Sequence, residues 1–222
     1  MTCDTSRSTV NDTDQILLYN PIMRISKEFI ILITAILLLI LTTNFPIVSD
    51  PRLYYLNYWA YLFLVPIAIL LASNERLTSF GFKKPKWPFR FSLTLVGAFL
   101  ILAMVYSWSL LPEFQEYYLA RIPKDNVIAF ILVTLGSYYF AEEFFFRGFL
   151  LFSLTKKFGS WAIVIQAIPF ALFHLGKPTL EIICALFVGL LFGHIAYKTK
   201  SFFYPFLIHW GIGVVLVILI AS

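Results

Sequence analysis

The chain has 222 residues, of which 60% are hydrophobic, 18% aromatic and only 13% charged. Soluble domains average about 25% charged residues, and the long apolar runs here are apolar on every face, so a water-soluble fold is excluded. The net charge of +5 is small and scattered along the chain, which argues against nucleic-acid binding. The composition therefore predicts an all-α fold, a polytopic bundle of transmembrane helices that contacts membrane lipid.

The apolar runs, taken in chain order, define seven spans after a polar start. Residues 1–25 are predicted to be a short N-terminal tail, and residues 26–222 a single membrane domain. About 20 apolar residues cross a bilayer as a helix, and each run ends at charged or Pro/Gly-rich residues. The predicted spans are 28–48, 54–73, 91–111, 126–150, 160–176, 179–197 and 201–221.

Lysine and arginine are distributed unevenly between the loops on the two sides of this predicted bundle. Twelve fall on the side of the N-terminus and four on the other, with Arg147 inside a helix. Cytoplasmic loops carry the excess of basic residues, so the N-terminal tail and residues 74–90 and 198–200 are predicted to be cytoplasmic. Residues 112–125 and the C-terminus are predicted to lie outside. The four outer cations are Arg52, Arg121, Lys124 and Lys177.

Of the ionisable side chains inside the predicted spans, five point to function, because a charge there is energetically costly. They are Glu142, Glu143 and Arg147 in the fourth span, His174 at the end of the fifth and His209 in the seventh. Glu143 and Arg147 are four residues apart, acid before base, so they are predicted to neutralise each other on one helix face. Glu142 points about 100° away and lacks that partner, as a general base should. The alternative is a buried charge network that only fixes helix packing.

Two hydrolytic designs fit one carboxyl group and two imidazoles. In the first, Glu142 and His174 hold and deprotonate a water molecule while His209 stabilises the oxyanion. In the second, the three side chains bind Zn²⁺ and leave its fourth position to water. The spacing alone does not choose between them, because the residues lie on three helices. No HExxH sequence, the pattern of one common zinc site, occurs in the chain.

The depths of the three side chains are unequal in this scheme. Glu142 lies eight residues from Leu150 and His209 eight from Ser201, so each is about 12 Å from the cytoplasmic end of its helix. His174 is 14 residues from Ser160, or about 21 Å. Convergence of the three groups therefore requires that the fifth helix start above the membrane, tilt or bend. Pro169 offers a cause for a bend, so a distorted fifth helix is predicted.

Three short motifs resemble those of a known family. EEFFFR at residues 142–147 matches EExxxR, FALFH at 170–174 matches FxxxH, and His209 stands where the family has HxxxN. This set resembles the CPBP family of intramembrane proteases, which includes CAAX-processing endopeptidases and bacteriocin-processing or self-immunity proteins. The resemblance covers about residues 126–215 and implies that this segment is the catalytic core.

The resemblance also implies roles for the site residues. Glu142 would activate water, His174 would assist it and His209 would stabilise the oxyanion, with Glu143 and Arg147 supporting the site or orienting the substrate. Both metal-dependent and metal-free mechanisms are described for such proteins. The metal-free mechanism is favoured here, with zinc held by Glu142, His174 and His209 as the alternative.

One position departs from the family pattern. Four residues after His209, where the family has Asn, this chain has Gly213. A hydrogen-bond donor to the oxyanion is therefore missing unless water, Trp210 or Gln166 replaces it. The sequence predicts reduced efficiency, and it predicts that Gly213→Asn raises turnover if the larger side chain is accommodated.

The favoured function is an intramembrane endopeptidase that cleaves a protein or peptide, with or without a prenyl group, near the cytoplasmic membrane face. A catalytically weak family member that acts in bacteriocin immunity or binds a partner protein is the second hypothesis. A small transporter with a buried Glu/His proton relay is the third. Only the first of these requires peptide cleavage.

Overall fold

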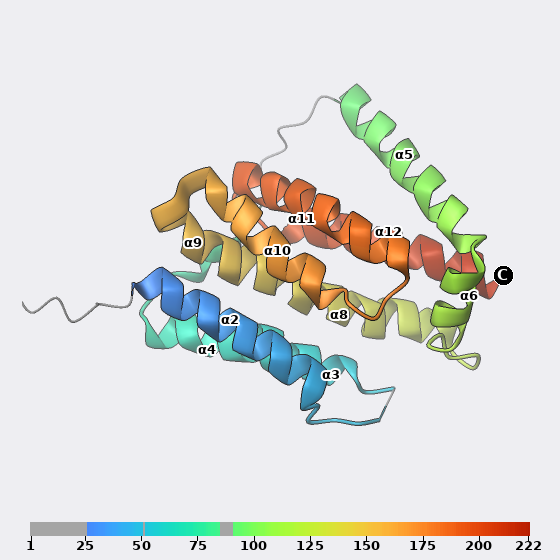
Figure 1. Cartoon of the computed structure of the whole chain (residues 1–222), viewed down its shortest axis with the longest axis horizontal. Coiled ribbons are helices and arrows are strands. Elements are labelled where there is room, and N and C mark those ends of the chain that lie inside the picture. The colour runs from blue at the N-terminus through green and yellow to red at the C-terminus, as the bar shows by residue number, and fades with distance from the viewer. Residues whose placement is uncertain (1–25, 51, 85–90) are drawn as a thin grey trace, which may run out of the picture.

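The computed structural model describes residues 26–50, 52–84 and 91–222, so the predicted tail 1–25 lies outside the described residues. The described residues form helices and connecting loops, without strands, and helices of opposite direction pack side by side along the long axis of the molecule (Figure 1). The helices outside the middle of the chain are α2 (Lys27–Asn44), α3 (Tyr55–Tyr58) continuing through a π-helical stretch into α4 (Val65–Ala72), α5 (Phe91–Ser109), α6 (Pro112–Leu119), α10 (Ala162–Phe173), α11 (Thr179–Thr199) and α12 (Phe203–Ala221).

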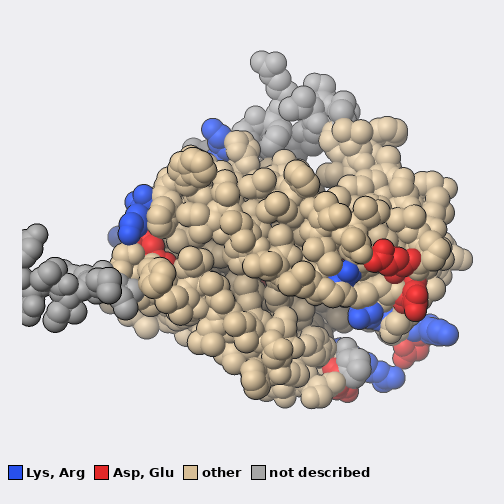
Figure 2. All heavy atoms as spheres, viewed as in Figure 1, with Lys and Arg blue, Asp and Glu red and all other residues tan. Residues whose placement is uncertain are grey.

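Among the described residues, five helical segments are long and apolar enough to cross a membrane, which supports the predicted membrane bundle. They are Lys27–Asn44, Tyr55–Ala72, Val127–Phe173, Thr179–Thr199 and Phe203–Ala221, and the third of them contains a turn at Gly159. Large apolar side chains are exposed along their outer faces, for example Ile33 and Phe187. Charged side chains in the visible face gather toward the two ends, with a broad uncharged band between them (Figure 2). A surface of this kind suits the hydrocarbon core of a bilayer.

One long helix, here called the central helix, differs from the prediction at its end. It comprises α7 (Val127–Ala129), η3 (Phe130–Leu135), α8 (Gly136–Glu143), η4 (Phe144–Leu150) and α9 (Leu151–Phe158), where η3 and η4 are π-helical. The predicted span ends at residue 150, but the helix continues for eight more residues, to the turn at Gly159, which has a φ of +53°. Lysines in its last turn are favourable at a helix C-terminus, so they do not mark a loop here.

This extension removes the difference in depth between Glu142 and His174 that the sequence suggests. Counted from the turn at Gly159, Glu142 is about 25 Å and His174 about 22 Å along their helices. The fifth helix, α10, therefore starts about two turns further out than the predicted end of the fourth, and its own end reaches the level of Glu142 without requiring a bend. Pro169 does lie inside α10, but the position of the turn alone explains the apparent mismatch.

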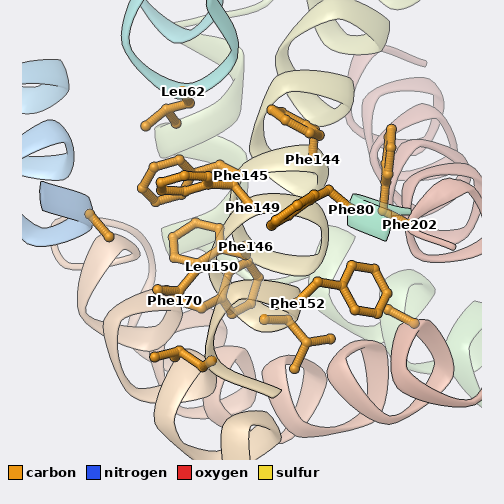
Figure 3. Packing of buried hydrophobic residues seen from close by; sticks show 14 of the residues in the cluster. Leu62, Phe80, Phe144, Phe145, Phe146, Phe149, Leu150, Phe152, Phe170 and Phe202 are labelled. Carbon is orange, nitrogen blue, oxygen red and sulfur yellow. The ribbon is translucent and has the colours of Figure 1, made fainter. Parts of the chain in front are cut away.

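The central helix is enclosed by the other helices. Every residue from 141 to 154 is buried, and this stretch contacts α2, α10 and α11 as well as the π-helical stretch before α4. A helix that is mostly apolar all round belongs in such a position. Figure 3 shows its phenylalanines packed in layers with rings from other elements, including Phe80, Phe170 and Phe202. The acidic pair Glu142 and Glu143 thus lies in an enclosed part of the molecule.

Ion pairs connect neighbouring elements at both ends of the bundle. At one end, Glu75 accepts hydrogen bonds from Lys27 at 3.0 Å and Lys156 at 2.8 Å, and these bonds lower the pKa of the Glu75 carboxyl below its usual value. At the other end, Glu181 binds Lys177 at 2.8 Å and the Tyr118 hydroxyl at 2.6 Å. The second network joins α6 to the start of α11.

Candidate active site

Three helices bring the predicted catalytic side chains together. Glu142 lies near the end of α8, His174 caps the C-terminus of α10, and His209 lies in the first half of α12. One carboxylate oxygen and one nitrogen from each imidazole lie within 4.8 Å of one another, and all three residues are buried. The predicted convergence of the three side chains is therefore present.

Glu142 differs from its neighbour Glu143 in its lack of partners. It is 0% exposed, and neither of its carboxylate oxygens has a hydrogen-bond partner among the described residues. Buried polar atoms are nearly always hydrogen-bonded, because desolvation without compensation is unfavourable. A buried carboxylate that lacks hydrogen-bond partners and faces two imidazoles is suited to bind water or another small polar species.

Glu143 instead has two partners at one oxygen. Its Oε1 accepts a hydrogen bond from Arg147 Nη1 at 3.1 Å, as the spacing of four residues predicts. The same oxygen lies 2.7 Å from His209 Nδ1, a contact that the sequence does not predict. No sequence signal links these two residues, which are 66 positions apart. Glu143 therefore fixes the orientation of the His209 imidazole through its Nδ1 atom.

Arg147 is held mainly by aromatic rings. The guanidinium carbon lies 3.9 Å from the ring centroid of Phe170, and Phe146 and Phe192 are further ring neighbours. Its Nε and Nη2 have no hydrogen-bond partner among the described residues. Cation–π contacts are strongest when the cation is desolvated, as it is here. Arg147 is thus a buried counter-charge for the acidic pair, positioned by the phenylalanine layers.

The hydrogen bonds of the two histidines leave the same ring nitrogen available. His174 Nδ1 lies 2.9 Å from the carbonyl oxygen of Phe170, which can only accept, so Nδ1 carries the proton. His209 Nδ1 likewise faces the carboxylate of Glu143. In both rings Nε2 is therefore left for a ligand in the site.

The same arrangement fits a metal ion. Glu142, His174 and His209 form a His₂Glu donor set, and the Glu143–His209 and Phe170–His174 contacts are typical of groups that orient zinc ligands from behind. Ligand atoms around tetrahedral Zn²⁺ are about 3.3 Å apart for bonds of about 2 Å. The donors and their supports therefore fit zinc, and donor atoms as far apart as 4.8 Å would move closer together around the ion.

Two suggested substitutes for the missing Asn are already engaged. Trp210 Nε1 donates to the carbonyl of Ile131 at 3.0 Å. Gln166 Nε2 donates to the carbonyls of Gly189 at 2.8 Å and Ile163 at 3.0 Å. Neither side chain is therefore placed to donate to an oxyanion, and both serve helix packing.

A cavity adjoins the site toward the end of the bundle that carries Arg121 and Lys177. It has a volume of about 590 Å³, within the range of small-molecule and peptide sites, and seven tyrosines contribute to its wall. A narrower pocket shares Tyr118, Tyr139, Gly213 and Leu216 with it and reaches His174 and His209. The two spaces are thus neighbours, and together they extend from a bundle end to the imidazoles.

Comparison with protein families gives a match to part of the chain. Residues 124–215 match the family described as type II CAAX prenyl endopeptidase Rce1-like. Neither the curated proteins nor the solved structures give a match to the chain. The matched segment contains the central helix, α10, α11 and most of α12, and therefore all five predicted site residues. Residues 124–215 are therefore similar to the Rce1-like proteins, in agreement with the resemblance of this segment to the CPBP family.

Proposed function

We propose that this chain is an intramembrane endopeptidase in which Glu142 activates water for attack on a peptide bond. The observation that carries the proposal is the unpartnered carboxylate of Glu142, enclosed in the bundle and facing two imidazoles within 4.8 Å. A structural carboxylate at this depth would be paired, as its neighbour Glu143 is. The Rce1-like match of residues 124–215 supports the same class of reaction.

The charges of the site favour the metal-free form of the reaction. Glu142 takes a proton from water, which His174 Nε2 helps to hold as an acceptor. His209 can donate from Nε2 to the oxyanion when it is protonated on both nitrogens. The carboxylate of Glu143 stabilises that cation, and the charges of Glu142, Glu143, Arg147 and His209 then sum to zero. A neutral buried group avoids the desolvation penalty of an unpaired charge.

The adjoining cavity is proposed to receive the substrate. Its tyrosines offer apolar ring faces together with hydroxyl groups, which suits an extended peptide with mixed side chains. Arg121 and Lys177 at its wall favour an acidic or carboxylate group. A prenyl group on the substrate is compatible with the apolar surroundings, and a protein or peptide remains the proposed partner.

The basic test is cleavage of a quenched-fluorescent peptide library by the full chain in detergent. We expect cleavage and a new amino terminus that mass spectrometry can locate. If the purified protein cleaves nothing and also leaves candidate membrane substrates uncut in cells, the hypothesis of a binding or immunity protein replaces this proposal.

The orientation of the chain in the membrane decides which side of the membrane the cavity faces. The excess of basic loops predicts a cytoplasmic N-terminus, but Arg121 and Lys177 in the cavity wall belong to the four cations of the opposite side. A cytoplasmic N-terminus would thus place the cavity toward the outside, whereas cleavage near the cytoplasmic face requires it inside.

Cysteine labelling of Glu116→Cys decides the orientation. From the charge distribution we expect an impermeant reagent to label it in intact cells, with substrate then entering from the outer side. The matched site at the other end is Lys84→Cys, which should be labelled only after lysis. The reversed pattern would place the N-terminus outside and the cavity on the cytoplasmic side. Both variants need a background without Cys3 and Cys184.

Metal removal tests the metal-free mechanism. We expect peptide cleavage to survive dialysis against a strong chelator, and the purified protein to contain well under one equivalent of zinc. Loss of cleavage on chelation, with recovery on adding zinc, would establish the alternative in which Glu142, His174 and His209 bind the ion. In that case, Glu142→Gln should also lower the zinc content of the protein.

A further inference from the structure

The glycine that replaces the family's Asn is in contact with a tyrosine of the central helix. A Cβ atom on Gly213 would lie 2.6 Å from Tyr139 Cε2, 2.7 Å from its hydroxyl oxygen and 3.0 Å from Cζ. Side-chain atoms do not approach so closely. The edge and hydroxyl group of Tyr139 therefore occupy the space into which a side chain at position 213 would project.

This tyrosine also lies against a proposed catalytic residue. The centroids of the Tyr139 and His209 rings are 4.2 Å apart, and Tyr139 is only 7% exposed. It lies three residues before Glu142, so both project from neighbouring turns of α8. Tyr139 and Gly213 line both the narrow pocket that contains His174 and His209 and the larger cavity beside it.

The hydroxyl group of Tyr139 is free to donate a hydrogen bond. Among the described residues it makes no hydrogen bond, whereas the Trp210 and Gln166 donors near the site are bound to backbone carbonyls. A neutral phenol can donate one hydrogen bond, and tyrosine is among the side chains that serve in oxyanion holes. Position, burial and an unused donor thus coincide in one residue.

We propose that Tyr139 supplies the oxyanion hydrogen bond that the residue at position 213 supplies in relatives with Asn. The inference rests on the proposed peptidase activity. Glu142 accepts a proton from water as the water oxygen bonds to the carbonyl carbon, and the carbonyl π electrons move to its oxygen. Tyr139 and His209 donate to that oxyanion. The carbon–nitrogen bond then breaks, the proton on Glu142 passes to the leaving nitrogen, and an amine and a carboxylic acid are formed.

If Tyr139 replaces the missing Asn as the donor, one expectation from the sequence is reversed. The sequence predicts that Gly213→Asn raises turnover if the side chain fits, but its Cβ alone would collide with Tyr139. The substitution should instead displace Tyr139 and lower turnover. Glycine at 213 and tyrosine at 139 act as a pair, so the missing Asn is no sign that chemistry has been abandoned.

The decisive variant is Tyr139→Phe, which removes only the hydroxyl oxygen. On the library peptide that wild type cleaves fastest, kcat should fall by about 10²–10³-fold, as for the loss of one oxyanion donor. Because the lost bond forms only in the transition state, KM should change by less than about threefold. The matched control is Tyr61→Phe, which removes a hydroxyl bonded to the Phe45 carbonyl outside the site and should leave kcat unchanged.

A side-chain exchange provides the second measurement. Tyr139→Ala with Gly213→Asn should turn over at least about tenfold faster than Tyr139→Ala alone, because Asn then enters the space that the ring has left. Thermal unfolding in the same detergent identifies any variant that fails to fold, and Tyr139→Phe then decides the question.

The possible results separate the two proposals. Wild-type cleavage that Glu142→Gln abolishes but Tyr139→Phe leaves within about threefold would overturn this inference and leave the peptidase proposal standing. A change in KM with constant kcat would also overturn it, because Tyr139 would then only bind substrate. A wild type without any cleavage would overturn the peptidase proposal and this inference with it.

Discussion

Replacing Glu142 by glutamine is expected to lower turnover by about 10²–10⁴-fold, the usual contribution of a general base. Glutamine has nearly the same shape but cannot accept the proton of the attacking water. Because neither Glu142 oxygen has a hydrogen-bond partner among the described residues, no existing hydrogen bond is lost. Because glutamine also keeps the volume of the side chain, the variant should be about as stable as wild type.

Lower activity at unchanged stability distinguishes Glu142 from Glu143. Activity is measured on a library peptide, and stability by thermal unfolding in the same detergent. Glu143→Gln is the matched control, since it weakens the contacts to Arg147 at 3.1 Å and His209 at 2.7 Å and should therefore lower the unfolding temperature. A Glu142→Gln variant that retains biological activity would contradict the protease proposal and favour a binding function.

Replacing Arg147 by methionine should destabilise the protein by about 3–5 kcal/mol, the effect of removing one partner from a buried ion pair. Arg147 and Glu143 are both 0% exposed, so water cannot replace the lost contact. Methionine retains apolar contact with Phe146 and Phe170, and thus the change tests charge more than volume. Equilibrium unfolding in mixed micelles gives the difference in free energy.

The double variant Glu143→Gln/Arg147→Met provides the control for this prediction. It leaves no unpaired charge at the two positions, so it should recover a large part of the stability lost by Arg147→Met alone. It should not recover activity, because glutamine in place of Glu143 lacks the charge that stabilises protonated His209. If Arg147→Met changes the free energy of unfolding by less than about 1 kcal/mol, solvent or lipid reaches the pair and the buried-charge argument is wrong.

The sequence could predict features that depend on composition or on local helix geometry. The excess of apolar residues identified a helical membrane protein, because such a surface is incompatible with water. The spacing of Glu143 and Arg147 predicted their contact, since residues four apart meet on any α-helix. The same helix geometry predicted that Glu142 points away from this pair. Local sequence does not fix helix ends. The fourth helix continues beyond residue 150 because Lys156 and Lys157 are as acceptable in a last helical turn as in a loop.

Contacts between distant helices were decided only by the tertiary structure. Motif resemblance placed Glu142, His174 and His209 in one site, but it did not reveal that Glu143 binds His209 across 66 positions. It also could not show which donors are already bound to backbone carbonyls, or that a tyrosine ring occupies the space above the glycine that replaces Asn. Helical periodicity fixes which side chains share a face of one helix. The rotation and depth of one helix against another depend on the packing of the whole bundle, and that packing selects the partners of each buried polar group.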